Sequence, residues 1–70
     1  MRVGELRRFK TPIRFSYDAR RVSGQVFMVV DISGQGPGHI ADLLLVDGAV
    51  EKGWDFHWVR DNSEALDETR

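Results

Sequence analysis

The chain contains no cysteine, which excludes disulfides and cysteine-ligated zinc as sources of its stability. Long hydrophobic runs are also missing. The densest, residues 26–30 and 43–46, are far shorter than the roughly 18 residues of a membrane-spanning helix. No apolar stretch follows the basic residues near Met1, so we expect no signal peptide. The absence of both cysteine and an export signal makes the cytoplasm the expected compartment.

Length is the next constraint, because 70 residues suffice for one small domain and leave no room for a dinucleotide-binding half-sheet or a TIM barrel. We therefore expect a single domain over residues 1–70. Its core must come from the 41% of residues that are hydrophobic, among them two Trp, four Phe and one Tyr. Residues 64–70 are mostly polar, so we expect this end to fray.

The two halves of the chain carry opposite charge, although the whole has a net charge of only −1. Residues 1–24 hold seven basic and two acidic side chains, a net of +5, while residues 25–70 hold three basic and nine acidic ones, a net of −6. Such asymmetry is typical of a nucleic-acid-binding segment, of two halves that pair within the fold, or of copies that pair with each other.

Period-2 patterns and turn signals predict short strands. Apolar and polar residues alternate over 13–17, which predicts a strand, and the polar residues 18–24 predict a turn or loop. Residues 25–32 form the clearest strand, and because neighbouring positions through Val30 are all apolar we expect it to be central and covered on both faces. Residues 33–38 hold three glycines and a proline, which predicts a loop.

Residues 40–46 are ambiguous. Asp47 and Gly48 form a strong hairpin signal directly after them, which favours a strand that pairs with residues 49–52. A helix over 38–46, opened by Pro37, is the alternative. Residues 54–60 alternate again and predict a strand with three aromatic side chains on one face. Residues 61–64 are typical of a helix cap and predict one helical turn there.

Together these patterns predict a mainly β fold: a small antiparallel meander or SH3-like barrel of four or five strands, with a short C-terminal helical turn. An α+β fold, a sheet with one helix at 38–46, is the alternative.

Two possible sites have little support from their spacing. The loop with Gly34, Gly36 and Gly38 follows a strand, as phosphate-binding loops do, but the helix and second parallel strand of a dinucleotide-binding unit do not fit, so we interpret it as a structural turn. The possible metal ligands are His39, Asp42, Asp55 and His57. Asp55 and His57 would share a strand face, but no pattern brings the other two to them. We expect no metal and no cofactor.

The basic N-terminal half mixes cations with aromatic rings, a composition used to bind single-stranded nucleic acid. The residues that would contact phosphate are Arg7, Arg8, Lys10, Arg14, Arg20 and Arg21. So small a core needs nearly every ring inside, and the pI of about 6.0 also argues against this function.

Residues 7–36 resemble the N-terminal half of a PilZ domain. The similarity lies in Arg7, Arg8 and Phe9, then Pro12, Ile13, Arg14 and Phe15, and in the Asp-x-Ser-x-x-Gly motif formed by Asp31, Ser33 and Gly36. Arg7 or Arg8 matches only the first arginine of the family's Arg-x-x-x-Arg motif, because Thr11 and Pro12 stand four positions later. The resemblance implies a β-barrel that binds cyclic di-GMP through Arg7, Arg8, Arg14, Asp31, Ser33 and Gly36.

No nucleophile–base pair or metal triad is recognisable in the sequence, so we expect a protein that is not an enzyme. The favoured hypothesis is a small interaction module that binds a protein partner or a second copy of itself through surface loops and segregated charges. Binding of nucleic acid or of cyclic di-GMP is the alternative.

Overall fold

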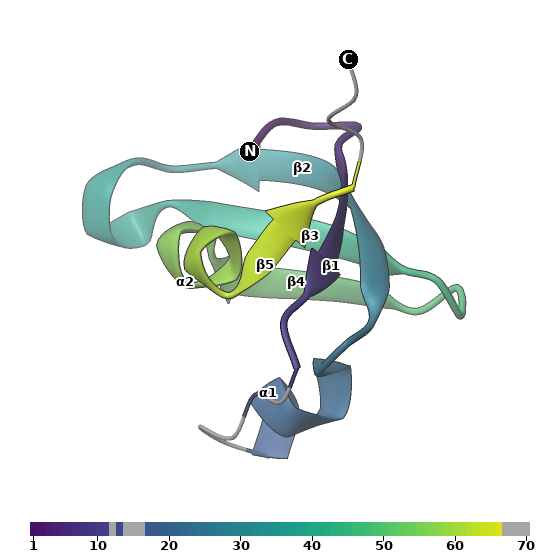
Figure 1. The fold of residues 1–70 in the computed structure, drawn as a ribbon. Helices are drawn as coiled ribbons and strands as arrows, with labels where there is room; N and C mark the ends of the chain where they lie inside the picture. Colours follow the sequence, from purple (N-terminus) through teal and green to yellow (C-terminus); the bar gives the residue numbers. More distant parts are fainter. Residues whose placement is uncertain (12, 14–16, 67–70) are drawn as a thin grey trace.

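The computed structural model describes residues 1–11, 13 and 17–66 and folds them into one open antiparallel sheet (Figure 1). Its strands are β1 (Leu6–Phe9), β2 (Val26–Ser33), β3 (Ile40–Leu45), β4 (Val50–Asp55) and β5 (Ser63–Ala65), and their order across the sheet is β4-β3-β2-β1-β5. The helices are α1 (Tyr17–Val22), the 3₁₀ turn η1 (Gly36–Gly38) and α2 (Phe56–Asp61). The predicted mainly β meander with five strands and a short helix near the C-terminus is confirmed.

One face of the sheet carries the hydrophobic core. Strand residues alternate, so that every second side chain of β1, of β3 and of β2 as far as Val29 is buried on this inner face. The helix α2 contacts β3, β4 and β5 and adds buried apolar side chains. The core consists of Phe9, Ile13, Val22, Phe27, Val29, Ala41, Leu43, Leu45, Phe56 and Val59, with Met1, Ile32, Trp54 and Trp58 packed against it.

The hairpin between β3 and β4 is confirmed. Gly48 has a φ of 93°, in the left-handed region that favours glycine, and its N–H donates to the Leu45 carbonyl at 2.9 Å. The Asp47 carboxylate accepts from the Ala49 N–H at 2.9 Å. Residues 40–45 are therefore a strand, and the alternative helix over 38–46 is wrong.

The strand predicted over residues 54–60 is wrong, because the chain turns into α2 at Phe56. Asp55 is the N-cap of this helix: its carboxylate accepts from the Trp58 N–H at 3.0 Å. Phe56 and Val59, three positions apart, then share the buried face of the helix. The short C-terminal helix is therefore α2 and does not lie at residues 61–64, where the cap pattern predicted it, since β5 begins at Ser63.

Replacing the N-cap, Asp55→Ala, is expected to lower the free energy of unfolding by about 1 kcal/mol, because the Trp58 N–H loses its acceptor. Asp61→Ala is the matched control. Asp61 lies at the other end of α2, where a carboxylate gains nothing from the helix dipole. Urea unfolding of both variants measures the difference, and equal effects would contradict the role assigned to Asp55.

Three further expectations need correction. Residues 17–22 form α1 rather than the predicted loop, and the strand predicted over 13–17 falls mostly on residues 14–16, which lie outside the described residues. Strand β2 is central, as predicted, but its outer face is not covered: Val30 is 39% exposed. Glu64 and Ala65, assigned to a fraying end, pair with β1 in β5.

Candidate functional site

A row of apolar side chains crosses the outer face of β1, β2, β3 and β4. In the strand register Leu6 lies opposite Met28, Met28 opposite Leu44, and Leu44 opposite Val50. The row continues beyond β1 to Leu66, the residue after β5, whose N–H donates to the Leu6 carbonyl at 3.0 Å. Antiparallel sheets with one solvated face usually carry polar side chains there, so this row requires an explanation.

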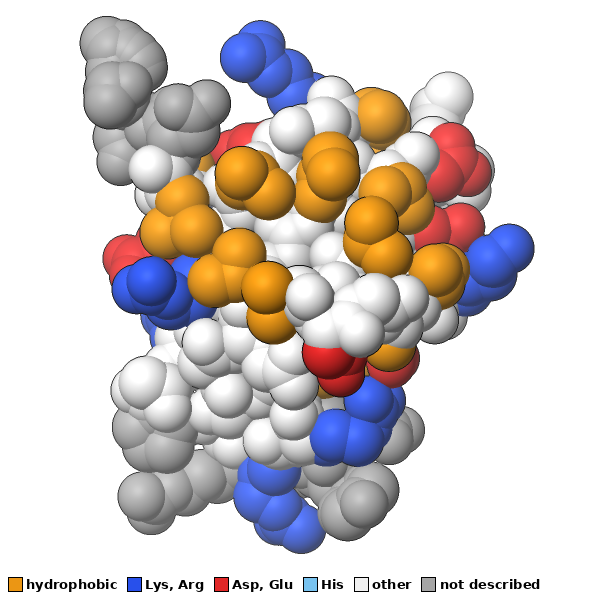
Figure 2. All heavy atoms as spheres, turned by 90° about the vertical axis from the view of Figure 1, so that its right-hand side faces the viewer, with side chains coloured by type: hydrophobic (Ala, Val, Ile, Leu, Met, Phe, Trp, Pro, Cys, Tyr) orange, Lys and Arg blue, Asp and Glu red, His pale blue; other side chains and the backbone are white. Residues whose placement is uncertain are grey.

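Neighbouring residues widen the row into an outer apolar patch, seen in Figure 2 as hydrophobic side chains gathered on one side of the molecule. Val46 is 73% exposed and Val50 is 56% exposed. A shallow depression of about 230 Å³ lies within the patch and is lined entirely by apolar residues. We define the outer apolar patch as Leu6, Val26, Met28, Val30, Leu44, Val46, Val50 and Leu66.

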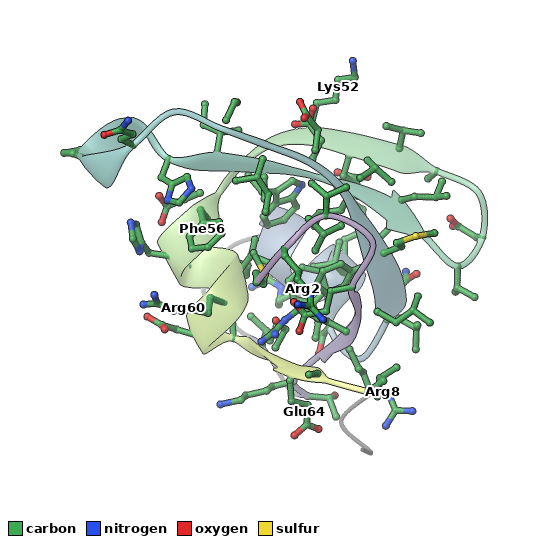
Figure 3. All side chains as sticks on the ribbon, turned by 90° about the horizontal axis from the view of Figure 1, so that it is seen from above. Arg2, Arg8, Lys52, Phe56, Arg60 and Glu64 are labelled. Carbon is green, nitrogen blue, oxygen red and sulfur yellow. The ribbon has the colours of Figure 1, made fainter. Side chains whose placement is uncertain are left out.

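Charged residues flank the outer apolar patch on two sides. On the first flank Arg8 of β1 lies opposite Glu64 of β5. On the second flank Asp31 of β2 lies opposite Asp42 of β3, and Lys52 follows on β4. Figure 3 shows the side chains of Lys52 and of Arg8 and Glu64 on opposite sides of the molecule. Each flank therefore holds both signs of charge, with an excess of negative charge on the second.

A β-bulge produces the two facing carboxylates of the second flank. The register of β2 and β3 shifts between Val29 and Asp31, which brings Asp31 directly opposite Asp42. Asp42 also accepts from the Gly53 N–H at 2.9 Å. Like charges directly opposite each other destabilise a sheet, and within the described residues neither carboxylate forms an ion pair.

Arg7, proposed from sequence as a phosphate ligand, is buried on the inner face and is 8% exposed. Its Nε donates to Ser63 Oγ at 2.8 Å, and Nη2 donates to the Ser63 carbonyl at 3.0 Å and the Arg60 carbonyl at 3.3 Å. Nη1 donates to Glu5 Oε2 at 2.9 Å. These contacts tie β1 to α2 and β5, so the guanidinium supports the fold.

Glu5 responds to two opposing influences. Burial raises the pKa of its carboxyl, but hydrogen bonds from the Arg2 N–H and the Arg7 guanidinium outweigh this, and the net pKa lies below the ordinary value of 4.5. The contribution of the ionised carboxylate to stability is therefore present above pH 4.5 and is lost as the pH falls through the lowered pKa.

The ion pair between Arg21 and Glu51 joins the basic half of the chain to the acidic half. Arg21 Nη1 and Nη2 donate to the two carboxylate oxygens of Glu51 at 3.0 and 3.1 Å. The Arg21 hydrogen bonds lower the pKa of Glu51, and a hydrogen bond from the Trp54 indole N–H adds to this effect against the burial that raises it. Part of the charge asymmetry is thus balanced within the fold.

The other basic candidates do not share a surface with Arg7. Arg8 lies on the outer face of β1, Lys10 follows that strand, and Arg20 is exposed on α1 below the sheet (Figure 1). Arg14 lies outside the described residues. The arrangement of the described cations therefore does not reproduce the continuous basic groove that nucleic-acid binding favours.

The glycine-rich loop has a structural explanation. Gly34 has a φ of 76°, and a Cβ atom there would clash with the Gly38 carbonyl oxygen. Glycine at this position lets η1 join β2 to β3. Ser33 is exposed where β2 ends, and Gly36 begins η1. The structure does not bring Arg7 to this loop, because the Arg7 side chain is buried against Ser63 and the Arg60 carbonyl.

Two histidines meet beside α2, which the sequence did not indicate. The His39 ring stacks on Phe56 with centroids 3.8 Å apart, and the His57 ring lies edge-on to His39 at 5.5 Å. Asp55 does not join them on a common strand face, since it caps α2. Over residues 1–11, 13 and 17–66 no group of three or more metal-ligating side chains is present.

The outer apolar patch is the feature that sequence reasoning missed. The indication of this patch in the sequence is the unbroken apolar run of residues 26–30, which by itself predicts burial on both faces of the strand. Among the described helices none is long and apolar enough to cross a membrane. The chain shows no significant match to a known family model, a curated protein or a solved structure.

Proposed function

We propose that this protein is a non-enzymatic interaction module that binds a protein through its outer apolar patch. The observation that carries the proposal is the row from Leu66 to Val50, which places apolar side chains on the outer face of four neighbouring strands and of the residue after β5. Large exposed apolar patches rimmed by polar residues mark interaction sites in small globular proteins. The charged flanks supply such a rim.

The proposal places binding on the sheet face instead of the loops. The loop from Gly34 to Gly38 is accounted for by its turn geometry, and Arg7 by its internal contacts. The strand order, in which the last strand pairs with the first, supports an SH3-like scaffold whose edges β4 and β5 are not joined. Such a scaffold holds the patch on hydrogen-bonded strands, so the surface is formed before a partner arrives.

A photo-cross-linking residue placed at Leu44, in the middle of the outer apolar patch, tests this function in cells that make the full chain. We expect covalent adducts at Leu44, either with a second copy or with another protein, and none at Gln35, an exposed position in the loop before η1. Gel shifts after illumination give the readout. A Leu44 position that forms no adduct beyond the Gln35 control would reject the proposed function.

A further inference from the structure

We infer that the protein covering the outer apolar patch is a second copy of this chain, packed face to face in a two-fold symmetric dimer. The inference rests on the proposed function and names its partner. Two such sheets would face each other about 10 Å apart, with apolar side chains between them, as in a β-sandwich.

The charges of the two flanks support the inference, because the cation on the first flank is complementary to the carboxylates on the second. Arg8 on the first flank is exposed and directed away from the core. On the second flank Asp31 and Asp42 face each other and lack a cation within the described residues. A guanidinium from outside would relieve this repulsion. The chain already displays such a guanidinium at the opposite side of the same patch.

Two-fold symmetry brings the two flanks together. A two-fold axis that lies in the interface and runs between the flanks places the first flank of one copy over the second flank of the other. Arg8 of each copy then lies over the flank of the other copy that holds the Asp31–Asp42 pair. This contact occurs twice in the dimer, and apolar residues meet at the centre.

Charge reversal on each flank, followed by mixing, tests this arrangement in the full chain. In R8E an acidic side chain faces the Asp31–Asp42 pair at both contacts. In D31R two arginine side chains face each other, beside Asp42, at both contacts. An equimolar mixture of R8E and D31R restores opposite charges at both contacts, so the heterodimer should form where neither homodimer does. This recovery depends on the two-fold arrangement.

Sedimentation equilibrium gives the expected result in numbers. We expect the dimer affinity to fall at least about tenfold in R8E and in D31R, and to return to within about threefold of wild type in the mixture. K10E carries the same charge change as R8E outside the patch and should dimerise as wild type does. L44E should remain monomeric while its circular dichroism stays that of the folded wild type.

Salt and cross-linking separate the two proposals. Wild-type dimerisation should weaken between about 50 and about 500 mM salt, since the flank contacts are screened. A wild-type chain that stays monomeric at about 1 mM, or a mixture that associates no better than its components, would reject the dimer. Adducts at Leu44 with other proteins only would reject the dimer and leave the proposed function intact, whereas no adducts at all would reject both.

Discussion

Phe9→Ala is expected to lower the free energy of unfolding by about 3–5 kcal/mol, the usual cost of truncating a fully buried phenylalanine. Phe9 is 0% exposed and lies at the centre of the aromatic core. Its ring centroid is 4.5 Å from that of Phe27, 6.0 Å from Trp54 and 5.9 Å from Trp58. The cavity would therefore open between β1, β2 and the start of α2, where few side chains can move in to fill it.

Urea unfolding followed by tryptophan fluorescence measures this loss, because Trp54 and Trp58 both border the Phe9 ring. A domain of this size has a small total stability, so part of the variant should already be unfolded without denaturant. Val30→Ala on the outer face is the control and should change stability by no more than about 0.5 kcal/mol. A loss below about 1 kcal/mol for Phe9→Ala would show that this ring is not the centre of the core.

Arg7→Met should cost about 3 kcal/mol, close to the effect of the core truncation, although it exchanges a charge for an apolar side chain of similar length. The substitution removes the Arg7 donors from the buried Ser63 hydroxyl and carbonyl and from Glu5 Oε2, and leaves Glu5 only the Arg2 N–H. Arg8→Met, one position along β1 on the outer face, is the matched control and should be nearly neutral in monomer stability.

The pH dependence separates an electrostatic role for Arg7 from mere packing. Because the Glu5 pKa lies below 4.5 in the folded chain, wild-type stability should fall as the pH drops from 4.5 through that lowered value. Without the Arg7 guanidinium the carboxyl loses part of what lowers its pKa, so Arg7→Met should lose less stability over the same range. Equal pH profiles for the two proteins would contradict the pairing of Arg7 with Glu5.

The sequence was a good guide where local turn chemistry agreed with the strand pattern. The hairpin at Asp47 and Gly48 and strands β2 and β3 were predictable, because turn geometry and β-branched residues favour the same structure there. The prediction failed over residues 54–60. The alternation of Trp54, Phe56 and Trp58 suggested a strand, but Phe56 and Val59 also have helical spacing, and Asp55 caps the helix that buries them.

The candidate site was less predictable, because a run of apolar residues in one chain does not show whether the second face of a strand is covered. The apolar run over residues 26–30 predicts burial on both sides, whereas Val30 is 39% exposed on the outer face of β2. Arg7 was misjudged for a related reason. Phe9, two positions later and therefore on the same face, indicated that this arginine points inward.

The pairing of β5 with β1 has a consequence for the speed of folding. Arg7 and Ser63 are 56 residues apart in the chain, yet the Arg7 side chain donates a hydrogen bond to the Ser63 hydroxyl between the paired strands β1 and β5. Closing so long a loop costs conformational entropy before the guanidinium contacts can compensate for it. The meander β2-β3-β4 is built from short-range contacts and can form early. The pairing of β1 with β5 joins the two ends of the chain and is expected to form last. Refolding should accordingly be limited by this late closure, more slowly than in a helical domain of equal length.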